Sequence, residues 1–224
     1  MIIFQYIYYF FRSLYYRGFS NTYKLLSYEQ KFEKQLGIST HSIVNLDSLT
    51  LASNASVENH HYQGASYYIL FSVLQKTPAH LKQTPFIDFG CGKGRALFVA
   101  EQCGFTNLIG VDIAKELIDD ANKNLVVYKP LNKTSRIQFQ FSDATTFAIP
   151  EDASVFYFFN PFGETIMQQV LQNITKSIKE NPREIICLYL NPKFKKVFEA
   201  NGFDVLFEEK NKRYTEAIAY SLKY

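Results

Sequence analysis

The feature that most constrains the fold of this chain is the stretch FIDFGCGKGR at positions 86–95, in which a short apolar run leads into alternating glycines. Glycine has no Cβ, so the backbone can turn tightly and a ligand can approach it at the N-terminus of the following helix. The stretch therefore predicts a strand, a turn and a helix, with a ligand at the turn. A glycine-rich turn without a ligand is the alternative.

The same stretch argues against two nucleotide-binding motifs. A dinucleotide fingerprint needs glycine or alanine three positions after its second glycine, where this chain has Arg95, so NAD is disfavoured. A P-loop is excluded because no Gly-Lys-Ser or Gly-Lys-Thr follows the glycines. The carboxylate of Asp88 disfavours a pyrophosphate and suits a cationic or hydrogen-bond-donating ligand.

Short apolar runs alternate with segments of helical periodicity through most of the chain. This alternation predicts a Rossmann-like α/β fold with a seven-stranded, mostly parallel sheet and helices on both faces. Two strand-like runs flank a charged turn at the end, so the last strand should be antiparallel. The expected strands are 86–89, 108–111, 137–141, 155–159, 185–190, 203–209 and 215–222, and the expected helices 62–81, 95–103, 114–128, 164–179 and 194–200.

Residues 1–59 are predicted to form a helical extension with a linker, and residues 60–224 the ligand-binding domain. Gly18 should divide the extension into two helices. Its apolar start is too short to span a membrane, because Arg12 and Arg17 interrupt it, and it lacks the layout of a secretory signal. We expect its aromatic face to pack on the main domain, with a dimer contact or a membrane surface as the alternative.

Composition favours a folded protein in a reducing cytoplasm. Hydrophobic residues make up 47% and charged residues 20%, as in ordinary globular domains. The net charge of +3 comes without a block of basic residues, so a dedicated nucleic-acid surface is not required. The three cysteines show no framework spacing and fit free thiols. The adjacent His60 and His61 do not converge on one ion, so no metal is expected.

Two further acids follow strands of the predicted sheet. In the run LIGVDI the apolar strand ends in Asp112, 24 positions after Asp88, where a carboxylate can hold the hydroxyls of a ribose. Asp143 follows the third strand beside Ala144, where a carboxylate can accept a hydrogen bond from an exocyclic amine. The alternatives are a helix-capping role for Asp112 and a solvated turn for Asp143.

Together these motifs resemble the class I S-adenosylmethionine-dependent methyltransferases, roughly over residues 62–224. The resemblance implies that S-adenosylmethionine is the cofactor, that the glycine turn lines its methionine part, and that Asp112 binds its ribose and Asp143 its adenine amine. In related enzymes the segment at the position of Tyr62 and Gly64 often covers the cofactor. The alternative is that these residues pack in the core. The expected cofactor site comprises Tyr62, Gly64, Asp88, Gly90, Cys91, Gly92, Gly94, Asp112, Ile113, Asp143 and Ala144.

The fourth strand runs into VFYFFNPFG, so Asn160, Pro161 and Phe162 are expected at the sheet edge where ligands bind. This stretch resembles the Asn-Pro-Pro-Phe or Asn-Pro-Pro-Tyr motif of methyltransferases that act on amide or amino nitrogens, with one proline missing. The resemblance implies that Asn160 and the backbone near Pro161 orient the target nitrogen while the aromatic ring stacks on its planar group. The missing proline alters the path of the loop. The methyl acceptor can therefore be a lysine-type amine or a small molecule as well as a planar base or glutamine.

The combined prediction is a cytoplasmic enzyme that transfers a methyl group to a nitrogen nucleophile. The acceptor would be a protein side chain or a small molecule, favoured over nucleic acid. Direct displacement needs positioning more than covalent help, so Asn160, Pro161 and Phe162 are the expected catalytic residues. The alternative is a catalytically inactive module that binds S-adenosylmethionine and acts through a partner.

Overall fold

The computed structural model describes residues 2–41, 44–45, 49–53, 61–212 and 214–222 of the chain. The predicted linker and the pair His60 and His61 therefore lie partly outside the described residues. Two helices come first, α1 (Ile2–Arg17) and α2 (Phe19–Leu36), and a short antiparallel pair follows, β1 (Val44–Asn45) with β2 (His61–Tyr62). The predicted division of the N-terminal segment at Gly18 is confirmed.

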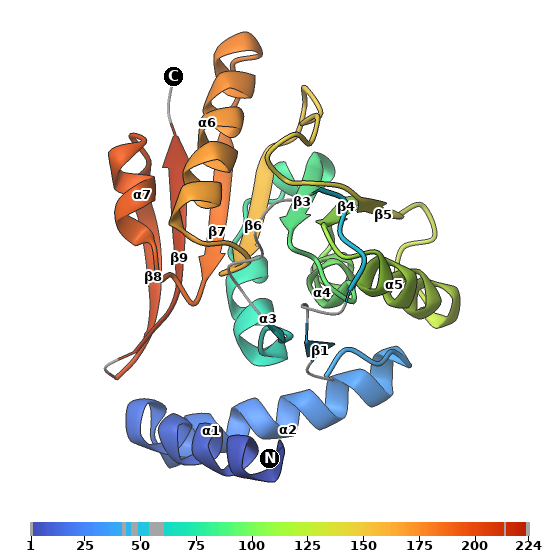
Figure 1. Cartoon of the computed structure of the whole chain (residues 1–224), viewed down its shortest axis with the longest axis vertical. Coiled ribbons are helices and arrows are strands. Elements are labelled where there is room, and N and C mark those ends of the chain that lie inside the picture. Colours follow the sequence, from blue (N-terminus) through green and yellow to red (C-terminus); the bar gives the residue numbers. More distant parts are fainter. Residues whose placement is uncertain (1, 42–43, 46–48, 54–60, 213, 223–224) are drawn as a thin grey trace.

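The main sheet has seven strands in the order β5-β4-β3-β6-β7-β9-β8 (Figure 1). The first five of these pair parallel to one another, and β9 pairs antiparallel with β7 and β8. The predicted mostly parallel sheet with an antiparallel last strand is therefore confirmed. The strands are β3 (Pro85–Phe89), β4 (Asn107–Asp112), β5 (Arg136–Phe141), β6 (Val155–Phe159), β7 (Ile185–Leu190), β8 (Asp204–Asn211) and β9 (Tyr214–Leu222).

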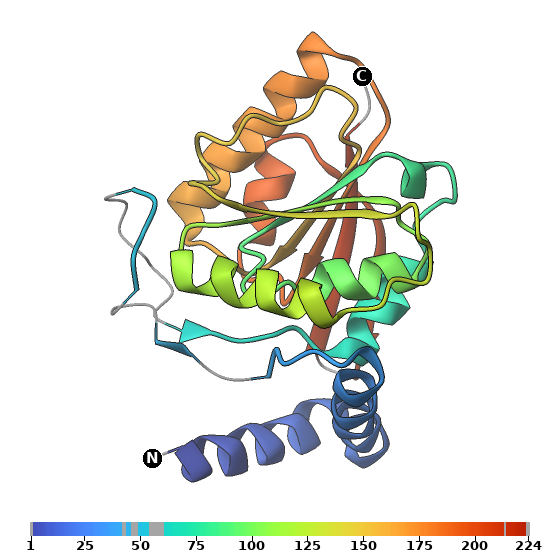
Figure 2. The same ribbon diagram turned by 90° about the vertical axis from the view of Figure 1, so that its right-hand side faces the viewer.

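Helices cover both faces of the sheet because alternate residues of the central strands point to opposite sides and both sets are apolar. In β6, Val155 and Tyr157 join one core cluster, whereas Phe156 and Phe158 join the other. Figure 2 shows α3 and α6 on opposite sides of the strands. The helices are α3 (Tyr67–Gln75), α4 (Arg95–Gln102) and α5 (Lys115–Val127) on the first face, and α6 (Glu164–Glu180) and α7 (Lys195–Ala200) on the second.

One predicted helix is shorter in the structure. The expected helix 62–81 is present only as α3, followed by a short 3-10 helix at Leu81–Gln83. Tyr62 lies in β2 instead, and Pro78 disfavours helical backbone at the residue before it, which limits α3 at its end.

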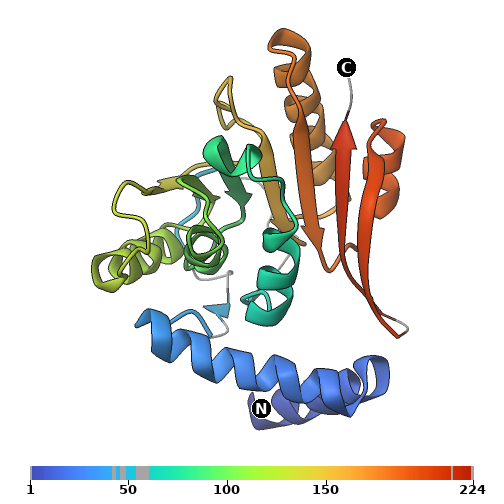
Figure 3. The ribbon, with the colours of Figure 1, turned by 180° about the vertical axis from the view of Figure 1, so that it is seen from behind.

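The N-terminal helices lie at the end of the sheet toward which the parallel strands point (Figures 1 and 3). The inner side of α2 packs on α3, where the Phe32 ring lies 4.4 Å from that of Phe71 and the Tyr28 ring 5.1 Å from that of Tyr68. This contact brings α2 close to the edge where the glycine turn begins. Among the described residues, no helix has the length and apolar character needed to cross a membrane.

Candidate functional site

The glycine turn joins β3 to α4 and is tied to the tip of β4. Gly90, Gly92 and Gly94 have φ values of 78°, 53° and 85°, which side-chain-bearing residues rarely adopt. The backbone N–H groups of Gly90 and Cys91 donate to the Val111 carbonyl at 2.8 and 3.0 Å. The sequence therefore placed the strand, turn and helix correctly, and pairing with β4 holds the turn in position.

Asp112 braces this turn from the end of β4. Its carboxylate accepts hydrogen bonds from the N–H of Gly92 at 2.7 Å and of Ala114 at 2.9 Å. Burial raises the pKa of Asp112 to about 6, although these N–H donors favour the charged form. Ala114 is itself the N-cap residue of α5, which has no side-chain cap hydrogen bond, so the helix-capping alternative for Asp112 does not hold, and the contact with Gly92 ties its carboxylate to the predicted cofactor turn.

Asp88 is deeply buried at the end of β3. Its exposed fraction is 2%, and burial together with the nearby Asp112 charge raises its pKa well above the usual range. Within the described part of the chain, no group donates a hydrogen bond to its carboxyl. Tyr157 is the register partner of Asp88 in the neighbouring strand β6, and its buried hydroxyl has no hydrogen-bond partner among the described residues either. Such a pair fits a ligand that brings positive charge or N–H groups.

Tyr62 contacts the glycine turn and Gly64 contacts Arg95, and their role as a cover over a cofactor stays a prediction. A Cβ on Gly92 would come within 2.0 Å of the Tyr62 ring, so the ring rests directly on that glycine. The Tyr62 hydroxyl donates to the Thr40 carbonyl at 3.0 Å, and burial raises its pKa. A Cβ on Gly64 would come within 2.7 Å of the Arg95 guanidinium.

Arg95 connects the N-terminal helices to the first residue of α4. Its guanidinium contacts Glu29 at 2.8 Å and Glu33 at 3.3 Å, donates to Thr40 Oγ1 at 2.7 Å, and lies 4.2 Å from the centre of the Tyr67 ring. Sequence reasoning used Arg95 only to argue against NAD and missed this role. The available signal was the four-residue spacing of Glu29 and Glu33, which places both carboxylates on one side of a helix.

Asp143 follows β5 and holds a turn. Its Oδ1 accepts hydrogen bonds from the N–H and hydroxyl of Thr145 at 2.8 and 2.7 Å, and its Oδ2 accepts one from Ser53 at 2.7 Å. Partial burial opposes ionisation, but these donors lower its pKa overall. The contacts agree with the alternative of a turn residue, and its role toward an adenine stays a prediction. Ser53 belongs to a segment whose Ala52 N–H donates to the Ile113 carbonyl at 2.9 Å.

The Asn-Pro-Phe turn after β6 contacts the glycine turn. A Cβ on Gly90 would come within 2.3 Å of Pro161 Cβ, so the two turns are packed together. Asn160 is buried with φ 46°, and its Oδ1 accepts a hydrogen bond from the Tyr189 hydroxyl at 3.3 Å. Phe162 packs against the core on the α6 face.

A second Asn-Pro turn, which sequence reasoning missed, lies beside the first. Phe159 and Leu190 are register partners in β6 and β7, so Asn160 and Asn191 follow at the same level of the sheet. Asn191 also has a positive φ, 50°, and its Oδ1 accepts a hydrogen bond from the Tyr214 hydroxyl. The sequence feature that could have predicted this second turn is a repeated pattern, in which one apolar strand runs into Phe-Asn-Pro and the next into Leu-Asn-Pro.

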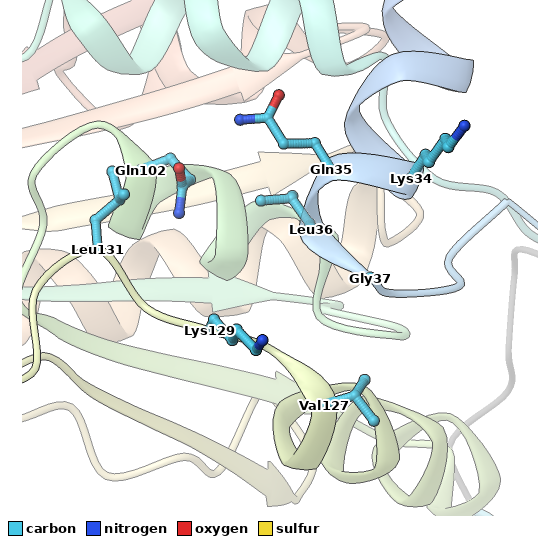
Figure 4. A pocket seen from close by; sticks show the side chains of 8 residues that line it. All are labelled: Lys34, Gln35, Leu36, Gly37, Gln102, Val127, Lys129 and Leu131. Atoms are coloured by element: carbon cyan, nitrogen blue, oxygen red, sulfur yellow. The ribbon is translucent and has the colours of Figure 1, made fainter.

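A separate pocket of about 270 Å³ lies at the opposite end of α4 from the glycine turn (Figure 4). None of the predicted site residues lines it, so we do not associate it with the chemistry of the turn. Among the described residues, no cluster of His, Cys, Asp and Glu could hold a metal ion. The pocket is lined by Lys34, Gln35, Leu36, Gly37, Gln102, Val127, Lys129 and Leu131.

The sequence matches a family model described as a methyltransferase domain over residues 80–219. The match includes the glycine turn, Asp112, Asp143 and both Asn-Pro turns. None of the curated proteins is matched significantly by the sequence.

Several solved structures share the fold. Magnesium protoporphyrin IX methyltransferase from Synechocystis, determined with bound SAM, has 14% identity and a TM-score of 0.52, with 70% of this chain and 79% of that chain covered. Ribosomal protein L11 methylase from Lactobacillus delbrueckii has 17% identity and a TM-score of 0.52, with the same coverage, 70% and 79%. A glycopeptide N-methyltransferase has 12% identity and a TM-score of 0.50, with 62% and 89% covered.

Proposed function

The chain belongs to the methyltransferase domain family, and from that premise we propose that it methylates a nitrogen acceptor with S-adenosylmethionine as methyl donor. The observation that carries the nitrogen assignment is the contact of the Asn160–Pro161 turn with Gly90 of the glycine turn. The similar structures are named for a porphyrin, a ribosomal protein and a glycopeptide as substrates, so membership of the family leaves the acceptor open.

The residues around the glycine turn fit this cofactor. When bound, S-adenosylmethionine supplies a methyl group activated by a positively charged sulfonium. The buried Asp88 carboxyl, which no described group hydrogen-bonds, favours a ligand with positive charge or N–H donors. We assign to the cofactor site Asp88, Gly90, Cys91, Gly92, Gly94, Asp112, Ile113, Asp143 and Ala144, with Tyr62 and Gly64 as its cover.

The two asparagines are proposed to orient the acceptor. Adjacent strands are about 4.8 Å apart, so two amides at the same level can contact one small group. Left-handed backbone at a residue other than glycine costs on the order of 1 kcal/mol or more and is often retained at functional sites. The Tyr189 hydroxyl donates a hydrogen bond to Oδ1 of Asn160, and the Tyr214 hydroxyl donates one to Oδ1 of Asn191. These bonds fix the orientation of the two side-chain amides. An amide oxygen has two lone pairs, so it can accept a second hydrogen bond, such as one from the N–H of a methyl acceptor.

This arrangement supports catalysis through positioning. An amine held in line with the donor methyl group reacts as a neutral nucleophile, and fixed geometry alone can supply a large part of the rate. A planar acceptor would need the Phe162 ring for stacking, but this ring packs against the core. The packing therefore supports a lysine-type or small amine at least as well as a planar acceptor.

The proposal is tested by separating cofactor binding from turnover in Asn160→Ala and Asn191→Ala. Removing an orienting amide should lower methyl transfer on the order of a hundredfold, while S-adenosylmethionine affinity by calorimetry stays close to that of the unmodified chain. The matched control is Asn122→Ala, whose side chain donates to the Ile118 carbonyl within α5 and to no other group in the described part of the chain. It should change neither quantity.

The acceptor itself is identified by incubating the chain with methyl-labelled cofactor and a fractionated lysate. Mass spectrometry of the labelled product should place the methyl group on nitrogen. A methyl group on carboxylate oxygen, or an Asn160→Ala variant that loses cofactor affinity and turnover in equal proportion, would contradict the assignment.

A further inference from the structure

The outer side of α2 exposes a stripe of large apolar side chains. Phe19, Tyr23 and Leu26 have exposed fractions of 77%, 66% and 51%. Their spacing of four and three residues places them on one side of the helix. Leu25 and Phe32, on the other side, pack into the core with α3. The stripe therefore points away from the domain, and its exposure is not needed to hold α2 in place.

The neighbouring helix α1 has a similar outer side. Phe11 and Tyr15 have exposed fractions of 63% and 68%, and Phe10 is also exposed. Ser13 lies on the inner side, where its hydroxyl is 2.9 Å from that of Thr22 in α2. We call the two exposed sets together the N-terminal aromatic surface, which comprises Phe10, Phe11, Tyr15, Phe19, Tyr23 and Leu26.

Charge around this surface has one sign. Residues 1–36 contain five lysines and arginines and two glutamates, so they carry the whole formal charge of +3, and residues 37–224 balance at 19 of each sign. Glu29 and Glu33 are half-buried, with side-chain exposed fractions of 31% and 15%, and both are paired with Arg95. The exposed charged side chains of the described part of α1 and α2 are therefore all cationic: Arg12, Lys24, Lys31 and Lys34.

These observations argue against a second copy of the chain as the occupant. A two-fold dimer through this surface would bring the same cations from both copies together, without an exposed carboxylate on either helix to pair with them. An anionic bilayer complements both features, since aromatic side chains partition into the interfacial region and lysines are attracted to acidic headgroups.

We propose that the N-terminal aromatic surface binds the surface of an anionic lipid bilayer. In its described residues, neither helix is long and apolar enough to cross a membrane, so the proposed contact is peripheral. The parallel strands point toward α1 and α2 (Figures 1 and 3), and Arg95 links α2 to the start of α4. Docking would thus hold the edge of the sheet that carries the glycine turn toward the bilayer.

The test measures co-sedimentation of the full chain with phosphatidylcholine vesicles, with and without phosphatidylglycerol, at low and high salt. We expect binding only to the anionic vesicles and weakening with salt. Replacing Lys24, Lys31 and Lys34 by glutamine should lower the partition coefficient on the order of a hundredfold, because each lysine near an anionic surface contributes a factor of about five.

The aromatic contribution is tested separately with Phe11, Phe19 and Tyr23 replaced by glutamine. This variant should lower partitioning to anionic vesicles about tenfold or more, because it removes exposed apolar area without changing charge. Circular dichroism checks that each variant is folded. Matched controls elsewhere on the surface are the triple glutamine variants of Val126, Val127 and Leu131 and of Lys193, Lys195 and Lys196.

Every other outcome counts against a bilayer. Absence of binding, equal binding to neutral vesicles, or equal losses in the control variants would refute the proposal. Dimerisation in light scattering that the aromatic variant abolishes, without vesicle binding, would assign the surface to a second copy. Binding to single-stranded RNA with no binding to vesicles would assign it to nucleic acid. No methyl donor is present in these measurements, so the result does not depend on the proposed function.

Discussion

Replacing Gly92 by alanine tests whether Tyr62 covers the glycine turn. Gly92 has φ 53°, and the new Cβ would lie 2.0 Å from Tyr62 Cε2 and 2.5 Å from Cδ2, so the ring must move. The left-handed backbone costs an alanine about 1–2 kcal/mol. Moving the ring adds about 1 kcal/mol for its hydrogen bond to Thr40 and about 1–2 kcal/mol for exposed ring surface. We expect a total loss of about 3–5 kcal/mol in the free energy of unfolding.

Gly37→Ala is the matched control. Gly37 has φ 69° and no atom within 4 Å of the added Cβ, so only the backbone cost of about 1–2 kcal/mol applies. Urea unfolding followed by circular dichroism measures both variants, and S-adenosylmethionine affinity should fall only in Gly92→Ala. In a Tyr62→Ala background, the cost of Gly92→Ala should shrink to that of Gly37→Ala. If Gly92→Ala and Gly37→Ala are equally destabilising in the unmodified chain, Tyr62 does not rest on the turn.

Three further predictions concern Asp112. Asp112→Ala should weaken S-adenosylmethionine binding by about 1.5–3 kcal/mol in calorimetry, which is the scale of hydrogen bonds to a charged group. NAD should bind neither form. Unchanged affinity for S-adenosylmethionine would show that Asp112 only holds the glycine turn in place. Its folded pKa of about 6 lies above the unfolded value of about 3.9, so its contribution to stability is complete below about pH 4 and lost as the pH rises through about 6. Urea unfolding between these pH values should show this decline, and the decline should be smaller in Asp112→Asn. Cofactor affinity should rise with pH in the unmodified chain, because the ionised carboxylate is the stronger acceptor for the ribose hydroxyls, and this rise should be smaller in Asp112→Asn. An unchanged pH dependence in Asp112→Asn would show that another group titrates.

Features that depend on neighbouring residues in the chain were predictable from the sequence. The bounds of β6 and β7 match the apolar runs, because a buried strand needs apolar residues on both faces. The turn at Gly90, the helix break at Gly18 and the final hairpin follow from local turn chemistry in the same way.

Side-chain partners across the fold were decided only by the tertiary structure. Arg95 meets Glu29 because α2 packs on α3 and lies over the start of α4, a contact between residues 66 positions apart. Asn191 lies level with Asn160 because β6 and β7 pair in a particular register, which neither strand specifies alone. The sequence by itself thus determined the strands of the main sheet, most of the helices and turns, and which acids follow the strands. Which of these polar groups meet was decided by long-range packing, since that depends on how distant elements bury their apolar faces together.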